Sequence, residues 1–226
     1  MGADINSSLV MIFDTETTGT RVHEDRVVEI GAVYWSAGRR CARPRQIRVN
    51  PGVPIPIGAS QVHNIFDEDV KDCASFDGIG DRFWHHVEHG IEGHKPILCG
   101  YNAINYDVRI MNAEFERHGF DYRINPDDVL DPFLFVSWHH RHWKVRKLEA
   151  VAARYGYELT NAHAATADCE ATGAVLSGMI NAGIIPAQLD EALAAQKTMR
   201  THLSDEDQRF RYHLYIDRED RETVRL

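Results

Sequence analysis

A run of five apolar residues, Leu9-Val10-Met11-Ile12-Phe13, most restricts how this chain can fold. An amphipathic helix would present a polar side chain within so short a run, so residues 8–13 are predicted to form a strand that is buried on both faces. The run ends abruptly at Asp14 and Glu16, and Gly19 then breaks the strand. Two acidic side chains are therefore expected at the edge of a hydrophobic core.

The remaining periodicity indicates strands first and helices afterwards. Strands are predicted at residues 27–34, 46–49 and 96–99, with Gly38 and Arg39 at a turn between the first two. Helices are predicted at residues 76–89, 108–118, 146–155 and 167–180. Strands that come first and then alternate with helices predict an α/β fold in which helices cover a mixed sheet.

Length and composition favour one domain with a substantial core, since 43% of the 226 residues are hydrophobic. The N-terminus has no basic-then-apolar leader, and no apolar run approaches the ~18 residues of a membrane span, so a cytoplasmic protein that does not enter the membrane is expected. The formal charge of −9 argues against a protein that wraps nucleic acid through a basic surface. It does not exclude a carboxylate site that divalent ions fill.

The C-terminal segment, residues 201–226, is expected to be an appendage to a main domain of residues 1–200. Apolar residues alternate with polar ones in it at Phe210, Tyr212, Leu214 and Ile216. This alternation predicts a strand that either extends the sheet or pairs with another chain. Residues 208–212 also faintly resemble a sliding-clamp-binding peptide, which makes a clamp a candidate partner.

Asp14 and Glu16 are two residues apart, so on a strand their side chains share a face. Two like charges at that position repel unless a cation holds them, and hard oxygen ligands suit Mg²⁺ or Mn²⁺. The alternative at this point is an exposed strand end with two solvated acids. Two helix starts add further acids. Asp107 and Asp168 each lie at the N-terminal end of an apolar stripe that is predicted to face the sheet.

These helix-start acids also have an ordinary explanation, because a carboxylate in the first turn of a helix is favoured by the helix dipole.

His163 lies five residues before Asp168, and residues at that spacing do not share a helix face. The histidine is therefore expected on the preceding loop, where it reaches over the same site.

Three segments together resemble the motifs of the DEDDh superfamily of exonucleases, in the branch of the DNA polymerase III epsilon subunit. They are FDTETTG at residues 13–19, YNAINYD at residues 101–107, and the spacing of His163 to Asp168. The resemblance runs from about residue 9 to residue 176 and includes VVEIGAV after the first motif.

This resemblance implies a ribonuclease H-like fold, with an antiparallel three-strand meander followed by parallel strands and flanked by helices. The domain of residues 1–200 would be a 3′-to-5′ exonuclease that releases nucleoside monophosphates. Two divalent cations, Mg²⁺ or Mn²⁺, would be held by four acids, with one of them bridging both ions, and a histidine would be the general base. The acids are Asp14, the bridging one, with Glu16, Asp107 and Asp168; the base is His163.

Substrate contacts are implied by the same resemblance. They fall on Thr15, Thr17, Thr18, His63, Ile65, Asn102 and Tyr106. For the threonines, a turn that needs Gly19 and tolerates threonine is the alternative.

The chain departs from the family pattern in four ways. Asn102 stands one residue further from the acid, Tyr106 replaces phenylalanine, Ala164 and Ala167 replace polar residues, and Asn64 stands where a loop glycine is usual, although asparagine also adopts positive φ.

Three hypotheses about function stay open, and the first two differ in the polymer that is cleaved. Cleavage mainly of single-stranded DNA is the first hypothesis, either by a free-standing enzyme or by a proofreading accessory of a polymerase. Trimming of RNA is the second, since nothing in a carboxylate site distinguishes ribose from deoxyribose, and an inactive nucleic-acid-binding module is the third. Basic and aromatic residues mix at residues 138–147, which indicates either a single-strand-binding surface or a packed, solvated face.

Overall fold

The fold is built on one mixed sheet, seen in a computed structural model that describes residues 2–160 and 162–206. Its strands follow the order β3-β2-β1-β5-β6, and β4 also pairs with β2. The strands are β1 (Val10–Thr17), β2 (Val27–Ser36), β3 (Arg39–Arg40), β4 (Arg45–Arg48), β5 (Ile97–Cys99) and β6 (Val129–Leu130). Strands β1 to β4 pair antiparallel and β1, β5 and β6 pair parallel, which confirms the predicted α/β mixed sheet.

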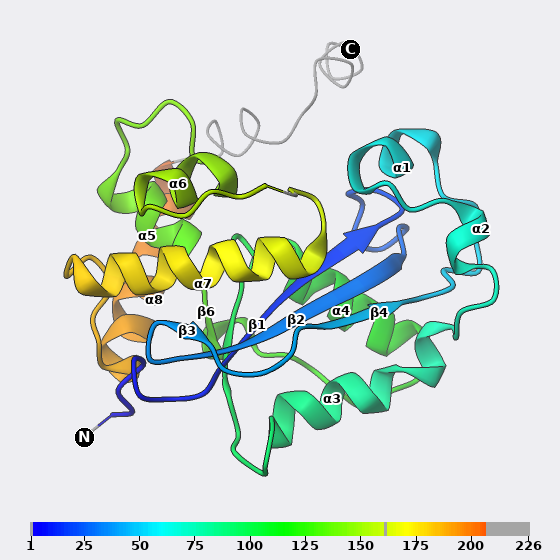
Figure 1. Cartoon of the computed structure of the whole chain (residues 1–226), viewed down its shortest axis with the longest axis horizontal. Coiled ribbons are helices and arrows are strands. Elements are labelled where there is room, and N and C mark those ends of the chain that lie inside the picture. Colours follow the sequence, from blue (N-terminus) through cyan, green and yellow to red (C-terminus); the bar gives the residue numbers. More distant parts are fainter. Residues whose placement is uncertain (1, 161, 207–226) are drawn as a thin grey trace.

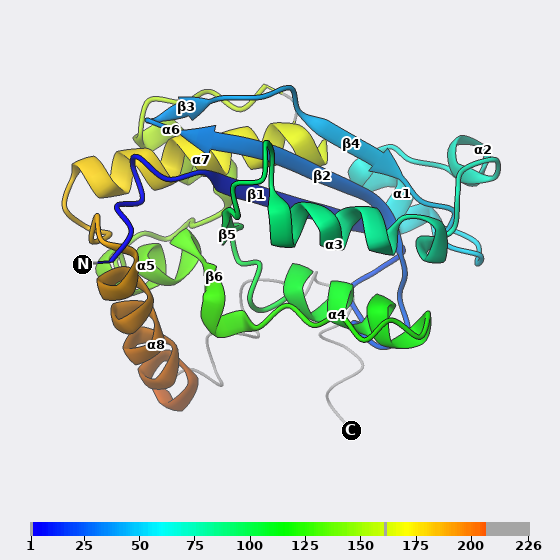
Figure 2. The same ribbon diagram turned by 90° about the horizontal axis from the view of Figure 1, so that it is seen from below.

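Helices cover both faces of this sheet (Figures 1 and 2). They are α1 (Ile57–His63), α2 (Asp67–Val70), α3 (Gly80–His89), α4 (Asp107–Arg117), α5 (Pro132–His139), α6 (Leu148–Arg154), α7 (Ala165–Asn181) and α8 (Leu189–Glu206), with 3₁₀ turns η1 (Phe76–Gly78) and η2 (Pro126–Asp128). Figure 2 shows α7 on one side of β1 and β2, and α3 and α4 on the other. Within the described residues, no helix has the combination of length and apolar character that a transmembrane segment requires.

Strand alternation in β1 divides the core into two clusters. Val10 and Ile12 pack in the cluster of α5 to α8, whereas Met11 and Phe13 pack in that of α3 and α4. The strand continues to Thr17, beyond the predicted end at residue 13. Asp14 and Glu16 therefore extend the face of Val10 and Ile12, toward α7.

Several elements differ from the sequence prediction. The predicted helices at residues 108–118 and 167–180 correspond to α4 and α7, but α5 and α8 were not predicted. Helix α5 has six consecutive buried residues, so it lacks the polar stripe that periodicity detects. Helix α8 crosses residue 200, where the appendage was expected to begin, and the predicted strand at residues 210–216 lies outside the described residues.

Gly31 of β2 allows α7 to lie close to the sheet at the position of the acids. It is the register partner of Asp14. A Cβ at Gly31 would lie 2.6 Å from the carbonyl carbon and Cβ of Ala165, the first residue of α7. That contact is too short for any side chain, so the absence of a Cβ sets the distance between β2 and the start of α7.

We expect Gly31→Ala to destabilise the protein by about 1–3 kcal/mol, the usual cost of overpacking, because the helix backbone must move. Gly58→Ala is the matched control, since a Cβ there meets nothing within 4 Å. Urea unfolding of both variants measures the difference. Equal midpoints for the two would contradict the proposed close contact.

Candidate active site

Three carboxylates converge between β1 and α7. Asp14, Glu16 and Asp168 each offer an oxygen, and these atoms lie within 4.8 Å of one another. Asp14 and Glu16 share a face of β1, and Asp168 lies in the first turn of α7, which covers that face. The structure thus brings together three of the four predicted acids.

Burial and mutual repulsion raise the pKa values of this cluster. Burial, then the charges of Asp168, Glu29 and Asp107, raise the pKa of Glu16 to about 9. Burial and neighbouring acids also raise the pKa of Asp14 well above its ordinary value, and burial raises that of Asp168. A cation among carboxylates this close favours their charged forms, and an all-oxygen donor set fits a hard divalent ion.

Asp107 lies beside the cluster, but its hydrogen-bond partner is Thr15, whose side chain lies on the other face of β1 from Asp14 and Glu16. Its Oδ1 accepts hydrogen bonds from the Thr15 amide (2.9 Å) and hydroxyl (2.7 Å). Thr15 alternates with Asp14 along β1, so it points toward α4, where Asp107 is the first residue. Burial raises the pKa of Asp107 to about 6, and the hydrogen bonds from Thr15 oppose that rise. The charge of Asp107 in turn raises the pKa of Asp14.

His163 lies on the loop before α7, as predicted, and its side chain is exposed. Its backbone has a left-handed φ of 65°. Its amide, and not its ring, donates to Asp168 Oδ2 at 3.2 Å. Across residues 2–160 and 162–206, no hydrogen bond occupies the imidazole nitrogens.

The four acids and the histidine all fall within the region that matches a known family. A family model described as exonuclease matches residues 11–176, nearly three quarters of the chain. The chain belongs to this exonuclease family. The predicted class, a DEDDh-type 3′-to-5′ exonuclease with a ribonuclease H-like fold, is confirmed.

Curated relatives of this exonuclease include PolC-type DNA polymerases III. The protein from Lacticaseibacillus paracasei is 30% identical over 173 residues, which are 76% of this chain and 11% of that protein. The Streptococcus pneumoniae protein is 27% identical over 173 residues, again 76% of this chain and 11% of that protein. The chain therefore spans only a small part of the length of these relatives.

Solved structures of exonuclease I share the fold. One has a TM-score of 0.65 at 20% identity and covers 86% of this chain and 44% of that chain. The Escherichia coli enzyme in complex with a dA16 oligonucleotide gives a TM-score of 0.63 at 20% identity, over 77% of this chain and 41% of that chain. A zinc-bound form of the Escherichia coli enzyme with single-stranded DNA has a TM-score of 0.62 at 19% identity and covers 88% of this chain and 43% of that chain.

The threonines after Asp14 are engaged within the exonuclease itself. The Thr17 hydroxyl donates to the Gly19 carbonyl (2.8 Å) and is hydrogen-bonded to the Tyr106 hydroxyl (2.5 Å). The Thr18 hydroxyl donates to Asp25 Oδ1 (3.1 Å) and accepts from the Arg26 amide (3.0 Å). These bonds fix the turn, and the predicted substrate contacts of the threonines and Tyr106 stay predictions.

His63 connects α1 to the end of β1. Its Nε2 hydrogen-bonds the Thr17 carbonyl (3.2 Å) and its Nδ1 accepts from the Ile65 amide (3.1 Å). Because Nδ1 accepts from an amide and Nε2 faces a carbonyl, these hydrogen bonds place the proton of a neutral ring on Nε2, and burial lowers the pKa of His63. Asn64 adopts the left-handed conformation (φ 56°), as its position in the motif predicted. Ile65 is buried, and its predicted substrate contact stays a prediction.

Asp131 is a buried acid that the sequence analysis missed. Its carboxylate accepts hydrogen bonds from the amides of Asn102 (2.8 Å), Ile104 (3.2 Å) and Phe133 (3.0 Å). It thereby holds the loop before α4, which carries Asn102. The Asp-Pro pair at the start of α5, a common helix-start signal, was the clue. Asn105, just before α4, does not cap the helix, since its side-chain amide donates to the Asn102 side chain.

Glu29 is a second missed acid, and its signal was a single carboxylate inside the apolar run VVEIGAV. It is 2% exposed and pairs in register with Glu16 across β1 and β2. Arg48 Nε lies 3.5 Å from Glu29 Oε2, and Arg48 Nη1 lies 3.5 Å from Asp69 Oδ1 in α2. The ion pair therefore joins the site to the α1–α2 region.

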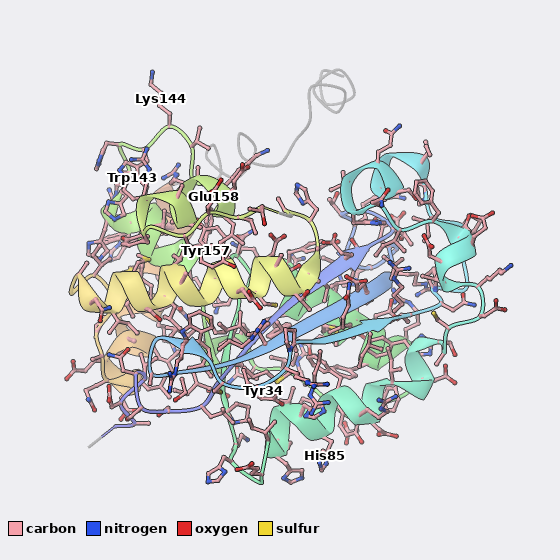
Figure 3. All side chains as sticks on the ribbon, viewed as in Figure 1. Tyr34, His85, Trp143, Lys144, Tyr157 and Glu158 are labelled. Atoms are coloured by element: carbon pink, nitrogen blue, oxygen red, sulfur yellow. The ribbon has the colours of Figure 1, made fainter. Side chains whose placement is uncertain are left out.

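The aromatic rings of residues 138–147 are covered by side chains of the same chain. Arg141 lies over Trp138, with its guanidinium carbon 4.4 Å from the ring centroid. His140 stacks on Trp143 at 3.8 Å, and Arg154 lies 4.3 Å from the same ring. Figure 3 shows Trp143 and Lys144 beyond α6, far from the arrowhead of β1. This geometry favours the packed alternative for the segment.

The raised pKa values make stability depend on pH and on divalent ions. Between the ordinary Glu16 pKa of 4.5 and its folded value of about 9, the folded state binds more protons than the unfolded state. We therefore expect metal-free Tm to fall as pH rises through this range. Mg²⁺ or Mn²⁺ relieves the same repulsion, so its stabilisation is greater at about pH 8.5 than at about pH 6.

Calorimetric melts with and without Mn²⁺ measure this effect, and Glu16→Gln is the control that flattens the pH dependence. A metal-free Tm that rises with pH over the range would contradict it.

Proposed function

We propose that this exonuclease hydrolyses the terminal phosphodiester bond at the 3′ end of single-stranded DNA and releases nucleoside 5′-monophosphates. The observation that carries the proposal is the convergence of three carboxylates from β1 and α7, with Asp107 and an unengaged imidazole beside them. Such a set fits metal-assisted phosphodiester hydrolysis.

Two divalent cations, Mg²⁺ or Mn²⁺, are the cofactors that the donor set suits. Asp14, Glu16 and Asp168 would hold them, with Asp14 bridging and Asp107 completing the set. The ions, when bound, supply Lewis-acid stabilisation of the charge on the phosphoryl oxygens. Thr15 keeps the Asp107 carboxylate oriented through its two hydrogen bonds.

His163 is the proposed general base. Its ring is exposed. The hydrogen bond from its backbone amide to Asp168, together with its left-handed backbone conformation, fixes the loop beside the acids. A neutral imidazole accepts the proton of the attacking water at a ring nitrogen. A protonated ring has no free nitrogen to accept that proton, so the proposed role requires the neutral imidazole.

DNA is the favoured polymer for two reasons. The curated relatives are named as DNA polymerases, and solved exonuclease I structures of the same fold are described with dA16 and dT13 oligonucleotides. RNA trimming stays the alternative, because nothing in a carboxylate site distinguishes ribose from deoxyribose. A polymerase partner is also proposed from these relatives, and the clamp-like residues 208–212 lie outside the described part of the chain.

We expect His163→Ala to lower kcat by about 10²- to 10⁴-fold, the usual contribution of a general base. Asp14→Asn should lower it further, because a bridging charge is lost. His85→Ala is the matched control, since His85 is exposed on α3, away from the sheet (Figure 3). Release of monophosphates from 3′-labelled oligonucleotides with Mg²⁺ or Mn²⁺ measures all three variants.

Full activity of His163→Ala would remove the base assignment. Matched DNA and RNA substrates decide the polymer: faster release from RNA would overturn the DNA proposal. Binding of both polymers without release by the native protein would overturn the proposed hydrolysis.

A further inference from the structure

A cavity of about 240 Å³ opens on the side of α4 that faces away from the sheet. Its walls come from the loop after Gly19, from α4, from the loop that follows α4, and from α8. Its volume is somewhat below the ~300–1,000 Å³ of typical small-molecule pockets, so it suits a single nucleotide unit. None of the residues assigned above to the acids or the base lines it.

The floor of this cavity is apolar. Val22, Ile104 and Val108 line it and are 9%, 4% and 1% exposed. Ile104 and Val108 flank Tyr106 and Asp107 in the sequence, so the cavity begins beside the acid that starts α4. An apolar floor of this kind suits the face of a base or a sugar.

The rim of the cavity is basic, in contrast to the acidic chain as a whole. Arg109 and Arg123 line it with exposed side chains, and neither forms an ion pair with any residue that the structure describes. Arg200 lines it too, although it pairs with Asp127 at 2.9 Å. Glu116 is the one carboxylate among the lining residues. Cations therefore outnumber acids, which favours a phosphate at the rim.

We propose that this cavity is a second nucleotide subsite, which holds one nucleotide of the strand whose 3′ end lies at the carboxylates. The phosphate lies between Arg109 and Arg123, and the base or sugar covers Val22 and Val108. The carboxylates lie on the α7 side of β1, whereas the subsite lies on the side of α4 that faces away from the sheet, so at least a helix diameter of about 10 Å separates them. A dinucleotide is thus too short to fill both sites, and a longer strand reaches both. The inference rests on the proposed exonuclease function.

Hydrolysis of a dinucleotide and of a decanucleotide tests the subsite. Arg109→Glu with Arg123→Glu should lower kcat/KM for the decanucleotide about tenfold or more, mainly through KM, because charge-assisted phosphate contacts are lost. The salt dependence of kcat/KM should become less steep by about 0.7 in log–log slope for each phosphate contact removed. The dinucleotide should keep its native kcat/KM.

Two further variants sharpen the result. Arg39→Glu with Arg82→Glu is the matched control, because it makes the same change of charge at exposed arginines outside the cavity. Ala113→Trp keeps the charge but fills the cavity that Ala113 lines, so it should show the same length-dependent loss. Thermal melts establish that each variant is folded.

An unchanged kcat/KM for the decanucleotide in folded Arg109→Glu, Arg123→Glu protein would overturn the subsite, as would an equal loss for both lengths or for the control. Folded Ala113→Trp with native kinetics would overturn the entry of a nucleotide. If the native protein hydrolyses neither length, the proposed function itself fails, and that result is distinct from all the others.

Discussion

Mutual repulsion among buried carboxylates is the constraint on which this structure depends. Asp14 and Glu16 point to the same side of β1 because strand side chains alternate, and α7 brings Asp168 to that side. The same alternation sends Thr15 to the other side, where it binds Asp107. One strand thus distributes the acids over both of its faces. Burial and repulsion disfavour the charged forms of these carboxylates, and a bound cation would offset both, which links the fold to metal-assisted chemistry.

Residues outside the cluster hold the surrounding loops and helices in place. Asp131 collects three amides and fixes the loop before α4, while its own amide donates to Gln196 Oε1 of α8 (2.7 Å). Glu29, next to Glu16, is paired with Arg48, which also reaches α2. Gly31 contributes by having no side chain, since α7 lies where a Cβ would be. Each feature places a loop or helix around the acids.

The sequence predicted the sheet, the helices that carry acids, and the acids themselves, because each leaves a local signal. Asp14 ends an apolar run, and Asp107 and Asp168 begin apolar stripes. Helix α5 could not be predicted from periodicity, since it is apolar on all sides. Asp131 and Glu29 also depend on partners distant in the chain, the amides of Asn102 and Ile104 for Asp131 and the guanidinium of Arg48 for Glu29. The hydrogen bonds of Thr15 to Asp107 join residues 92 apart, which no local pattern encodes.

Anomalous diffraction from crystals grown with Mn²⁺ tests the central claim most directly. The account predicts two manganese peaks bounded by Asp14, Glu16 and Asp168, one of them shared with Asp107, and their loss in crystals of Asp14→Asn protein. Strong peaks only at other acids, or ordered metal-free carboxylates in crystals saturated with Mn²⁺, would contradict it.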